Sequence, residues 1–301
     1  MRGSIRSGWF AGALFALALC ASHGMPVHAA SDGGVGVVAG YRPSAARFTF
    51  VRANRDEPVP VQIGAVVMAG DRITLSGGDV VTVQLSNGKS ANFSGPGTFM
   101  VPDARPLGQL AVILQSLTAL VDDEYRLAGT AASRGGEGCG QDGQAVKPIA
   151  VPILLPGARV QAGTRDLPLG WRGGCPPFIV AVHDDDQTVV HRESIAGWQV
   201  RLDQVPLPVG HYEVVITDAG GRRAELSLEA LPATPTMPPE LAADAGNLGI
   251  IAQAAWLAEQ DAGRWRLDSF ERLRPLIRAG DPLAGSFGDA LLWAPAPPAT
   301  H

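Results

Sequence analysis

The sequence has little of the side-chain chemistry from which most catalytic and nucleic-acid-binding sites are built. Its 301 residues include 3 cysteines and 6 histidines, with aromatic residues at 6% and charged residues at 18%. The 24 basic residues are outnumbered by 29 acidic ones, which gives a net charge of -5. Such a chain has no basic excess to neutralise a phosphate backbone, so we expect no nucleic-acid partner.

Long apolar runs are also scarce, except near the start of the chain. There, Arg2 and Arg6 precede an apolar run over residues 9–21, and small residues follow as far as Ala29 and Ala30. This order is typical of a secretory signal peptide over residues 1–30, cleaved after Ala29 or Ala30. The alternative is a retained membrane anchor, for which the run is short. We therefore expect an exported protein of the periplasm.

The few cysteines divide between this segment and the rest of the chain. Cys20 lies in the apolar run, where the large Leu19 before it disfavours lipid attachment. Cys139 and Cys175 both lie beside glycines, and two cysteines in an exported chain usually pair. A disulfide between them would stabilise the fold by about 3 kcal/mol. A reactive thiol or a metal-binding pair is the alternative, but neither cysteine has a histidine or aspartate at ligand spacing.

Glycine and proline, in contrast, are abundant, with 37 and 24 residues, and such a composition favours turns over long helices. The turns are dense between Val59 and Val101, where Gly70-Asp71, Gly77-Gly78 and Asn87-Gly88 separate short apolar runs. Asn-Gly between alternating segments is a strong hairpin signal, because both central residues of a type I′ turn need positive φ. We therefore expect a small, twisted, antiparallel β-unit.

This stretch resembles the FecR-like periplasmic domain. That family has a Gly-Asp turn, a Gly-rich step, an apolar strand, a hairpin and a closing strand, which correspond here to Gly70-Asp71, Ser76-Gly77-Gly78, Val80–Leu85, Asn87-Gly88-Lys89 and Phe93–Phe99. The resemblance implies binding and signalling rather than catalysis, since the periplasmic part of such proteins contacts an outer-membrane receptor and a cytoplasmic part contacts a sigma factor. This chain departs from that pattern, because cleavage of the signal peptide would leave no cytoplasmic part.

The elements around the β-unit extend it to a domain expected at 46–124. Residues 31–45 are rich in small residues and are expected to lack structure, and Arg47–Arg52 alternates as a first strand. After the β-unit, residues 106–123 follow a helical period with a wide apolar face. Such a face needs a cover, either the open side of the β-unit or a partner. The candidate interaction residues on this face are Leu110, Ile113 and Leu117.

A Gly-rich linker at 125–148 precedes a second β region at 149–231. About seven short apolar runs separated by turn residues are the pattern of a small β-sandwich. The expected strands are Ile149–Leu155, Leu167–Trp171, Phe178–His183, Thr188–Arg192, Trp198–Leu202, His211–Thr217 and Arg222–Leu228. A Pro-Gly turn leading into the strand of Tyr212, together with Trp171 as a core tryptophan, resembles the immunoglobulin-like modules at the level of fold.

A Pro-rich linker at 232–239 leads into a helical region at 240–293. The expected helices are Glu240–Ala262, Leu267–Ala279 and Pro282–Trp293. The first two resemble a tetratricopeptide-like hairpin, which cannot bury its apolar face alone, so we expect it to pack on the sandwich or on a partner. The fold class is therefore mainly β: a FecR-like antiparallel β-unit plus helix, a small β-sandwich and a short α-helical hairpin.

Groups of ligand-type side chains are few. The densest is Asp184-Asp185-Asp186 with His183 and His191, which lacks the glycine and the distal glutamate of a calcium loop, so a solvated turn is favoured. No Gly-x-Ser-x-Gly motif is present. We expect no catalytic residue, no metal and no cofactor. Trp265 and Trp293 are expected to be the more exposed tryptophans.

These observations favour a non-catalytic periplasmic interaction or sensor-adaptor protein of the cell envelope, similar to FecR. Its partner would be an envelope protein, such as a membrane sensor or an outer-membrane protein, held by the edge strands of the β-unit or by the apolar helix. The alternative is a cell-wall or polysaccharide-binding protein, for which a row of exposed aromatics would bind the glycan. A third hypothesis, a periplasmic hydrolase, would need a cleft with convergent acids or a bound metal.

Overall fold

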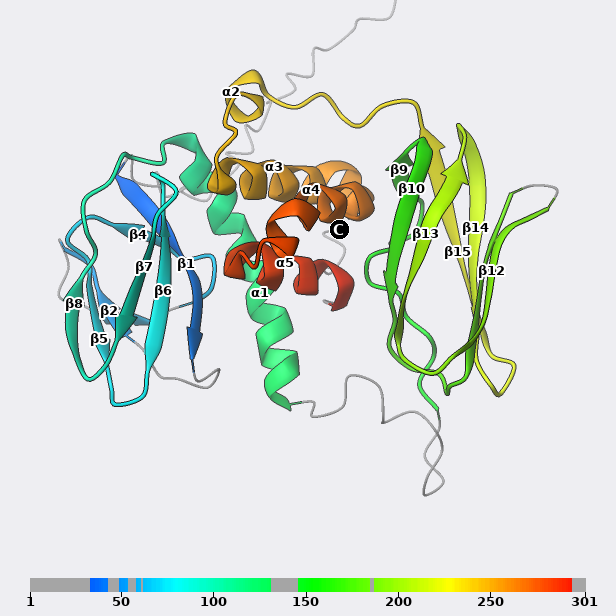
Figure 1. Cartoon of the computed structure of the whole chain (residues 1–301), viewed down its shortest axis with the longest axis horizontal. Coiled ribbons are helices and arrows are strands. Elements are labelled where there is room, and N and C mark those ends of the chain that lie inside the picture. The colour runs from blue at the N-terminus through cyan, green and yellow to red at the C-terminus, as the bar shows by residue number, and fades with distance from the viewer. Residues whose placement is uncertain are drawn as a thin grey trace, which may run out of the picture. The chain divides into compact units, whose positions relative to one another are not determined.

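The computed structural model describes residues 33–42, 49–53, 58–60, 62–130, 146–184 and 187–293 of the chain. The fold is mainly β, with several sheets and a C-terminal helical region (Figure 1), as the sequence predicts. The expected signal peptide and its cleavage site at Ala29 and Ala30 lie outside the described residues, as does Cys139.

The first β module consists of two antiparallel four-stranded sheets, in the orders β4-β1-β6-β7 and β3-β2-β5-β8. Its strands are β1 (Gly34–Arg42), β2 (Thr49–Val51), β3 (Pro58–Pro60), β4 (Val66–Met68), β5 (Arg72–Leu75), β6 (Val80–Leu85), β7 (Ser90–Ser94) and β8 (Gly97–Met100). Apolar side chains of both sheets, among them Phe50, Ile73 and Val83, are buried between them as one core. The strands are antiparallel, as predicted, but they form two sheets packed face to face instead of one small β-unit.

Strand β1 corrects one expectation, because the stretch 31–45 was expected to lack structure. Residues 34–39 are all buried. Val35 and Val38 point into the core of the module, whereas Val37 and Ala39 join a second apolar cluster built mostly from helices. A strand buried on both faces reads as a continuous apolar run without alternation. Gly36 is needed there, since a Cβ atom at that position would lie 2.6 Å from the carbonyl oxygen of Gln84.

The β6–β7 hairpin forms as predicted, but its turn is of a different type. The N–H of Gly88 donates to the oxygen of Leu85 at 3.0 Å, and the N–H of Leu85 donates to the oxygen of Lys89 at 2.8 Å. Gly88 has φ of 79°, and Asn87 is not among the residues with positive φ. The loop is therefore a three-residue turn with a glycine bulge instead of the two-residue type I′ turn.

Helix α1 spans Gln109–Thr130. It was predicted to end at the acidic residues 122–124, but it continues through them. Ala111, Leu114, Leu117 and Val121 are buried on one face. That face packs on α3 and α5 near the end of the chain. The cover of the apolar helix is thus supplied mainly by the C-terminal helices of the same chain.

The second β module has seven strands, the expected number. They are β9 (Ala158–Gln161), β10 (Gly163–Gly170), β11 (Phe178–His183), β12 (Thr188–Ile195), β13 (Gln199–Leu207), β14 (Gly210–Thr217) and β15 (Arg223–Leu231). The five-stranded sheet β12-β11-β14-β15-β9 faces the pair β10-β13. Six strands overlap the predicted ones. The first prediction, Ile149–Leu155, is wrong: apart from a bridge at Ala150 the segment is a buried turn, with Ile153 and Leu154 in the core.

Two features of this module agree with the immunoglobulin-like pattern. The hydroxyl of Tyr212 donates to the carbonyl oxygen of Pro208 at 3.0 Å, which is the bond that a tyrosine corner makes. Trp171 is fully buried and meets Phe178 edge to face, with 5.2 Å between ring centroids. Both residues therefore have the core roles that the sequence predicts.

The C-terminal helices contribute to two of the three apolar clusters of the described residues. They are α2 (Pro239–Ala242), α3 (Asn247–Glu259), the short helix η3 (Gln260–Gly263), α4 (Arg266–Arg278) and α5 (Pro282–Trp293). The helix expected at Glu240–Ala262 is broken between α2 and α3, and the other two form as predicted. Phe287 of α5 is buried in the cluster that includes β1 and α1, while Leu267 of α4 is buried in the core of the second β module. Figure 1 shows these helices between the two β modules.

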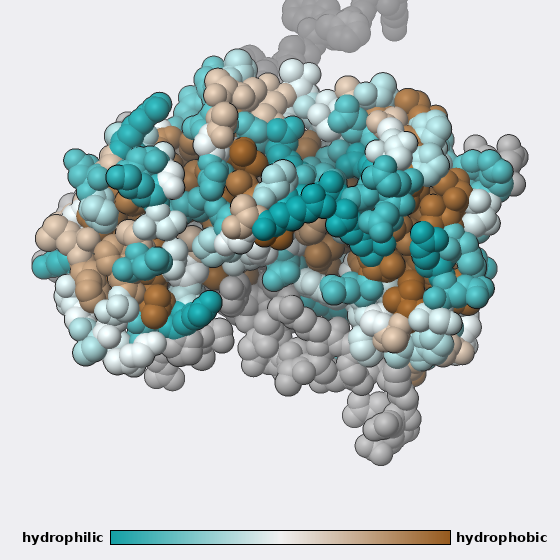
Figure 2. Space-filling model, in the orientation of Figure 1, coloured by the Kyte–Doolittle hydropathy of each residue, from teal (hydrophilic) through white to brown (hydrophobic). Residues whose placement is uncertain are grey.

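Few large apolar side chains are left on the surface. On the face drawn in Figure 2, hydrophobic residues form small patches separated by hydrophilic ones. Among the described residues, the exposed large hydrophobic ones are Met100, Val112, Ile179 and Val209, which belong to four different segments. Scattered single residues of this kind are normal for a protein surface and do not by themselves mark an interface.

The burial of α5 against α1 and β1 predicts a large effect of Phe287→Ala. We expect the free energy of unfolding to fall by about 3–5 kcal/mol, because the substitution leaves a cavity among helices of the shared cluster. Urea unfolding of the chain, followed by circular dichroism, measures the change. Val112→Ala, at a position 53% exposed on α1, is the control and should stay within about 0.5 kcal/mol. Equally small effects of both substitutions would contradict the described packing of α5.

Candidate functional site

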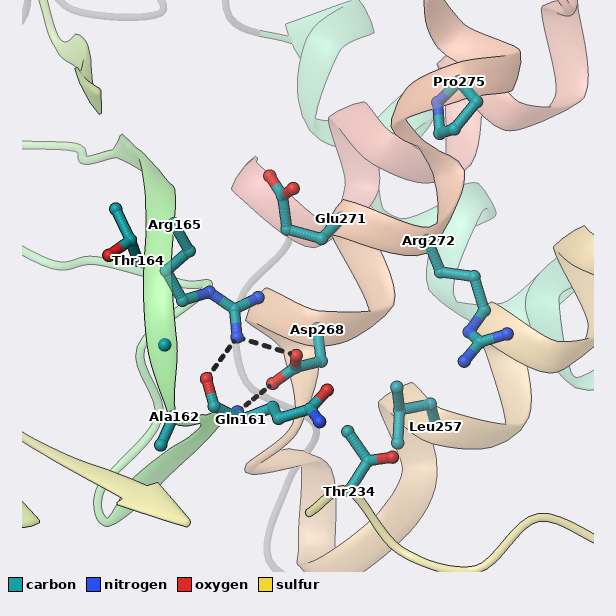
Figure 3. Close-up of a pocket in the computed structure, with 11 residues that line it drawn as sticks. Gln161, Ala162, Thr164, Arg165, Thr234, Leu257, Asp268, Glu271, Arg272 and Pro275 are labelled. Atoms are coloured by element: carbon teal, nitrogen blue, oxygen red, sulfur yellow. Dashed lines mark hydrogen bonds and ion pairs between the residues drawn. The ribbon is translucent and has the colours of Figure 1, made fainter. Parts of the chain in front are cut away.

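A cleft of about 470 Å³ lies where the second β module meets helix α4. It is lined by Gln161, Ala162, Gly163, Thr164, Arg165, Thr234, Leu257, Asp268, Glu271, Arg272 and Pro275. Figure 3 shows Arg165 reaching from β10 toward Asp268 on α4, while Arg272 projects from the same helix. A volume of this size falls within the range of small-molecule sites, and four charged side chains line it, so we take it as the candidate site.

Arg165 and Asp268 fasten the helix to the sheet. Nη1 of Arg165 donates to Oδ1 of Asp268 at 2.9 Å and to the carbonyl oxygen of Gln161 at 2.8 Å. The backbone N–H of Gln161 donates to Oδ2 of Asp268 at 2.9 Å. Both oxygens of this carboxylate, which is 8% exposed, are therefore bonded. Burial raises the pKa of Asp268, against the opposing effect of Arg165.

Asp166, the next residue along β10, anchors a second group of arginines. Its Oδ1 accepts the backbone N–H of Gln204 at 3.0 Å, and its Oδ2 accepts bonds from Arg201 and, at 2.6 Å, from Arg274 of α4. The N–H of Gln204 is the largest cause that lowers the pKa of Asp166 far below its usual value, and the two arginines lower it further. This acid is therefore ionised throughout the neutral range.

A bulge in the sheet aims that N–H at Asp166. The register between β10 and β13 shifts between Arg165 and Leu167, and Gln204 on β13 has φ of 52°. A left-handed conformation at a residue other than glycine carries strain, which the surrounding structure must hold in place. Here the bonds from the backbone and side chain of Gln204 to Asp166 supply that restraint.

Glu271 is the third acid at this junction. Both of its carboxylate oxygens lie within 3.2 Å of Nη1 of Arg274, at 3.2 and 3.1 Å. Burial raises the pKa of Glu271, while Arg274 lowers it. Asp268 and Glu271 on one wall are the convergent acids that a hydrolase would need, but both are held in ion pairs by fixed arginines. Their geometry fits the docking of α4 to the β module better than proton transfer.

The hydrogen-bonding capacity that remains in the cleft is on the donor side. Both bonds of Arg165 use Nη1, and its buried Nε has no hydrogen-bond partner among the described residues. Arg272 is exposed and donates from Nη1 to Oε1 of Gln253 at 2.7 Å, and its charge acts to lower the pKa of Asp268. Gln253 is itself fixed by bonds to the carbonyl oxygens of Leu241 and Asp244.

The predicted interaction residues of α1 lie elsewhere, against the C-terminal helices. Leu117 is 3% exposed and belongs to the shared helical cluster, and Leu110 and Ile113 are partly buried against the same cluster. These side chains already have a cover within the chain. A partner would have to compete for Leu110 and Ile113 and would not reach Leu117 without opening the fold.

The predicted disulfide and the acidic turn at residues 184–186 lie only partly within the described residues. Cys175 is partly buried, but Cys139 falls outside the described residues, so the disulfide stays a prediction. At the Asp184 turn, Oδ1 of Asp184 accepts the N–H of Gln187 at 2.8 Å, as in an ordinary turn, and Asp185 and Asp186 are not described. Within the described ranges no three His, Cys, Asp or Glu side chains group as a metal site.

The tryptophans expected to be exposed are buried. Trp265 is 2% exposed, and its indole N–H donates to Oδ2 of Asp261 at 2.8 Å. Trp293 is 5% exposed and packs over Gly170, where a Cβ atom would lie 3.3 Å from the indole ring. The sequence prediction for this pair was wrong, because the turn after η3 and the end of α5 both face the second β module.

Comparisons with known proteins identify no relative of this chain. No model of a known protein family matches the chain, and a search of characterised proteins finds none with significant similarity. The resemblance of residues 59–101 to the FecR-like domain therefore stays a prediction. In the described part of the chain, none of the helices combines the length and apolar character that crossing a bilayer requires.

The cleft itself was not predicted from the sequence. Its strand residues and its helix residues are separated by about a hundred positions, as Arg165 and Asp268 are, with |i−j| of 103. The available signal was the spacing of Asp268, Glu271 and Arg272, which puts charged residues on one side of a helix whose apolar residues are buried on the other. Nothing in the sequence indicates that this face meets β10.

The lowered pKa of Asp166 predicts how its contribution to stability depends on pH. A carboxyl whose pKa is lower in the folded chain than in the unfolded chain stabilises the fold above its unfolded pKa of about 4 and loses that effect as the pH falls further. Asp166→Asn should therefore destabilise the protein at neutral pH, and the difference from the unchanged protein should shrink as the solution is acidified below about pH 4.

Urea unfolding at several pH values measures this difference. Asp203→Asn is the matched control, because Asp203 also pairs with Arg201 at 2.9 Å but is 67% exposed, and exposed pairs contribute little. A destabilisation by Asp166→Asn that is constant between neutral and acidic pH would show that its charge is not what holds the junction.

Proposed function

We propose that the protein is a non-catalytic interaction or sensor-adaptor protein of the cell envelope, similar to FecR-like periplasmic proteins. Its partner is an envelope protein that offers an extended segment. The observation that carries the proposal is an open edge of the first β module: β7 and β8, consecutive strands, are each the last strand of their sheet and have one hydrogen-bonded neighbour among the described residues.

The backbone groups that face outward on β7 follow from the hairpin register. The N–H of Leu85 donates to the oxygen of Lys89, and Val83 pairs with Ala91 and Val81 with Phe93. Since antiparallel strands alternate between bonded and unbonded pairs, Ala91 and Phe93 bond to β6. The backbone N–H and C=O groups of Ser90, Asn92 and Ser94 therefore point away from β6. A partner strand lying there would form hydrogen bonds with them.

The side chains along this edge suit a polar, specific contact. Ser90, Asn92, Ser94 and Thr98 are exposed, and Oγ1 of Thr82 donates to Oδ1 of Asn92 at 2.8 Å across the hairpin. Phe93 and Phe99 point inward and pack on each other, with 5.7 Å between ring centroids. The edge is thus fixed from within by aromatic packing, and it presents hydroxyl and amide groups outward.

The structure also bears on the two other candidate surfaces. The apolar face of α1 is covered by α3 and α5, so we place the interaction on the β7–β8 edge in preference to that helix. Glycan binding requires stacking faces, whereas Trp171, Trp265 and Trp293 are buried and Trp198 packs against Phe178 at 6.1 Å between ring centroids. The adaptor function is therefore favoured over binding of a polysaccharide.

Asn92→Pro tests the edge directly. Proline removes the outward N–H of Asn92 without removing a bond to β6, and proline is tolerated on edge strands. We expect the variant to fold and to lose the envelope protein that the unchanged chain retains from detergent-solubilised envelope extract. Mass spectrometry identifies that protein, and purified components then give the change in affinity.

Asn92→Thr is the matched control, since it keeps the backbone N–H and a polar side chain that can accept from Thr82. It should retain the partner. If the Asn92→Pro chain, folded by circular dichroism, binds the same partner with unchanged affinity, the edge is not the docking surface. Retention of polysaccharide alone, unaffected by either substitution, would replace the adaptor function with the glycan-binding one.

A further inference from the structure

The segment between the second β module and the C-terminal helices is rich in proline and has no helix or strand. Residues 232–239 read Pro-Ala-Thr-Pro-Thr-Met-Pro-Pro, and Figure 1 shows the chain running there from β15 to α2. After a bend at residues 232 and 233, the chain reaches Pro238, which has φ of -53° and ψ of 135°. These angles lie near the polyproline II conformation. Pro235 and Pro238 restrict their own φ to it and bias the residue before them toward it.

The backbone of this segment is free of hydrogen bonds, as the backbone of a polyproline II helix is. No backbone group of residues 232–237 bonds to another described residue. Before the segment, the N–H of Ala162 donates to the oxygen of Leu231 at 2.7 Å, and after it the N–H of Leu241 donates to the oxygen of Pro238 at 3.1 Å. Both ends are therefore fixed, while the backbone between them is open to solvent or to a partner.

Burial along the segment follows a period of three residues. Thr234 lines the cleft beside α4, and Met237 packs against the helical cluster. A polyproline II helix has three residues per turn, so these two share the side that faces the protein. Pro235 and Pro238 share a second side, which we call the proline ridge, and Thr236 lies on the third. Pro238 and Thr236 are exposed and Pro235 is partly buried, so the ridge is accessible from solvent.

We propose that the proline ridge docks into an aromatic-lined groove of a partner protein. Two prolines three residues apart are the P-x-x-P pattern that such grooves bind in the polyproline II conformation. Between Glu229 and Asp244 the only charged residue is Glu240, so proline rings and backbone groups make the contact instead of ion pairs. This interaction goes beyond the β7–β8 edge, because it uses another surface and because here the chain itself supplies the extended segment.

The structure prepares the ridge for such a partner. A free proline-rich peptide loses conformational freedom when it binds, whereas this segment is held at one end by β15 and at the other by α2, which lowers that cost. The carbonyl oxygens of residues 232–237 accept no hydrogen bond within the described chain. They can accept from the O–H of tyrosine or the N–H of tryptophan in the groove.

Amide ¹H–¹⁵N spectra of the full chain test the ridge. The probes are purified SH3, WW and EVH1 domains, since these are the kinds of domain whose grooves bind proline-rich segments. We expect saturable binding of at least one of them, with shifts in residues 231–242 and none in the first β module.

Substitution of both ridge prolines tests their role. Pro235→Ala combined with Pro238→Ala should weaken binding by about tenfold or more, because ring contacts are lost and the segment becomes less restricted. Pro102→Ala is the matched control, an exposed proline of the first β module, and should leave the affinity unchanged. Thermal unfolding checks that each variant is folded. Pro235→Ala alone leaves the start of α2 intact and gives the same test if the double variant unfolds.

Three results would overturn the proposal. They are absence of saturable binding by all three kinds of domain, shifts confined to residues outside 231–242, and an affinity that the proline substitutions leave unchanged in a folded chain. None of them decides the function of the β7–β8 edge, which Asn92→Pro tests in the first β module with a different partner.

Discussion

The fold depends on a constraint that short helices cannot meet alone: an apolar helical face must be covered. Helix α1 has such a face, and so do α3 and α5, and the structure buries them against one another and against β1. Helix α4 continues this arrangement toward the second β module, where Leu267 enters its core and Phe270 contacts both clusters. The two β modules are thereby joined through α1 and the C-terminal helices, which lie more than a hundred residues apart in the sequence.

Polar contacts then fix where the helices attach. Arg266, 2% exposed at the start of α4, donates to the carbonyl oxygen of Pro152 at 2.9 Å. Arg159 of β9 pairs with Asp261 at 2.7 Å, while Asp166 and Asp268 hold arginines of the strand and the helix. At the first β module, Nε2 of Gln84 donates a hydrogen bond to Oδ2 of Asp281 at 2.9 Å, which links the start of α5 to that module. Among these groups the carboxylates of Asp166 and Asp268 are buried and paired with arginines, and removing one partner of a buried pair is strongly destabilising.

How much of this the sequence predicts depends on whether the signal is local. Turn residues and alternating runs are local, and they predicted the β6–β7 hairpin and six strands of the second β module. The turns at Gly70-Asp71 and Gly77-Gly78 join strands of different sheets. Strand β1 was missed because it is buried on both faces and therefore shows no alternation. The buried turn of Val151–Leu155 was taken for a strand because its apolar residues fill a core without pairing. The cover of α1, the burial of Trp265 and the charged cleft depend on contacts between distant segments, for which a single sequence carries no signal.

The same distinction governs the functional conclusions. The β7–β8 edge follows from strand order and register. The cleft follows from contacts across the junction of α4 and β10. Among the described residues β7 has one hydrogen-bonded neighbour, and this is the reason why we propose a partner that offers an extended segment.

The central claim is that the C-terminal helices and α1 form one cooperative core. Native-state hydrogen exchange of the full chain in increasing urea tests it most directly. If these helices form one core, the buried amides of α1, α3 and α5 become exposed with the same free energy of opening. Opening of α3 and α5 at a much lower free energy, while α1 stays protected, would show that they are a separate appendage.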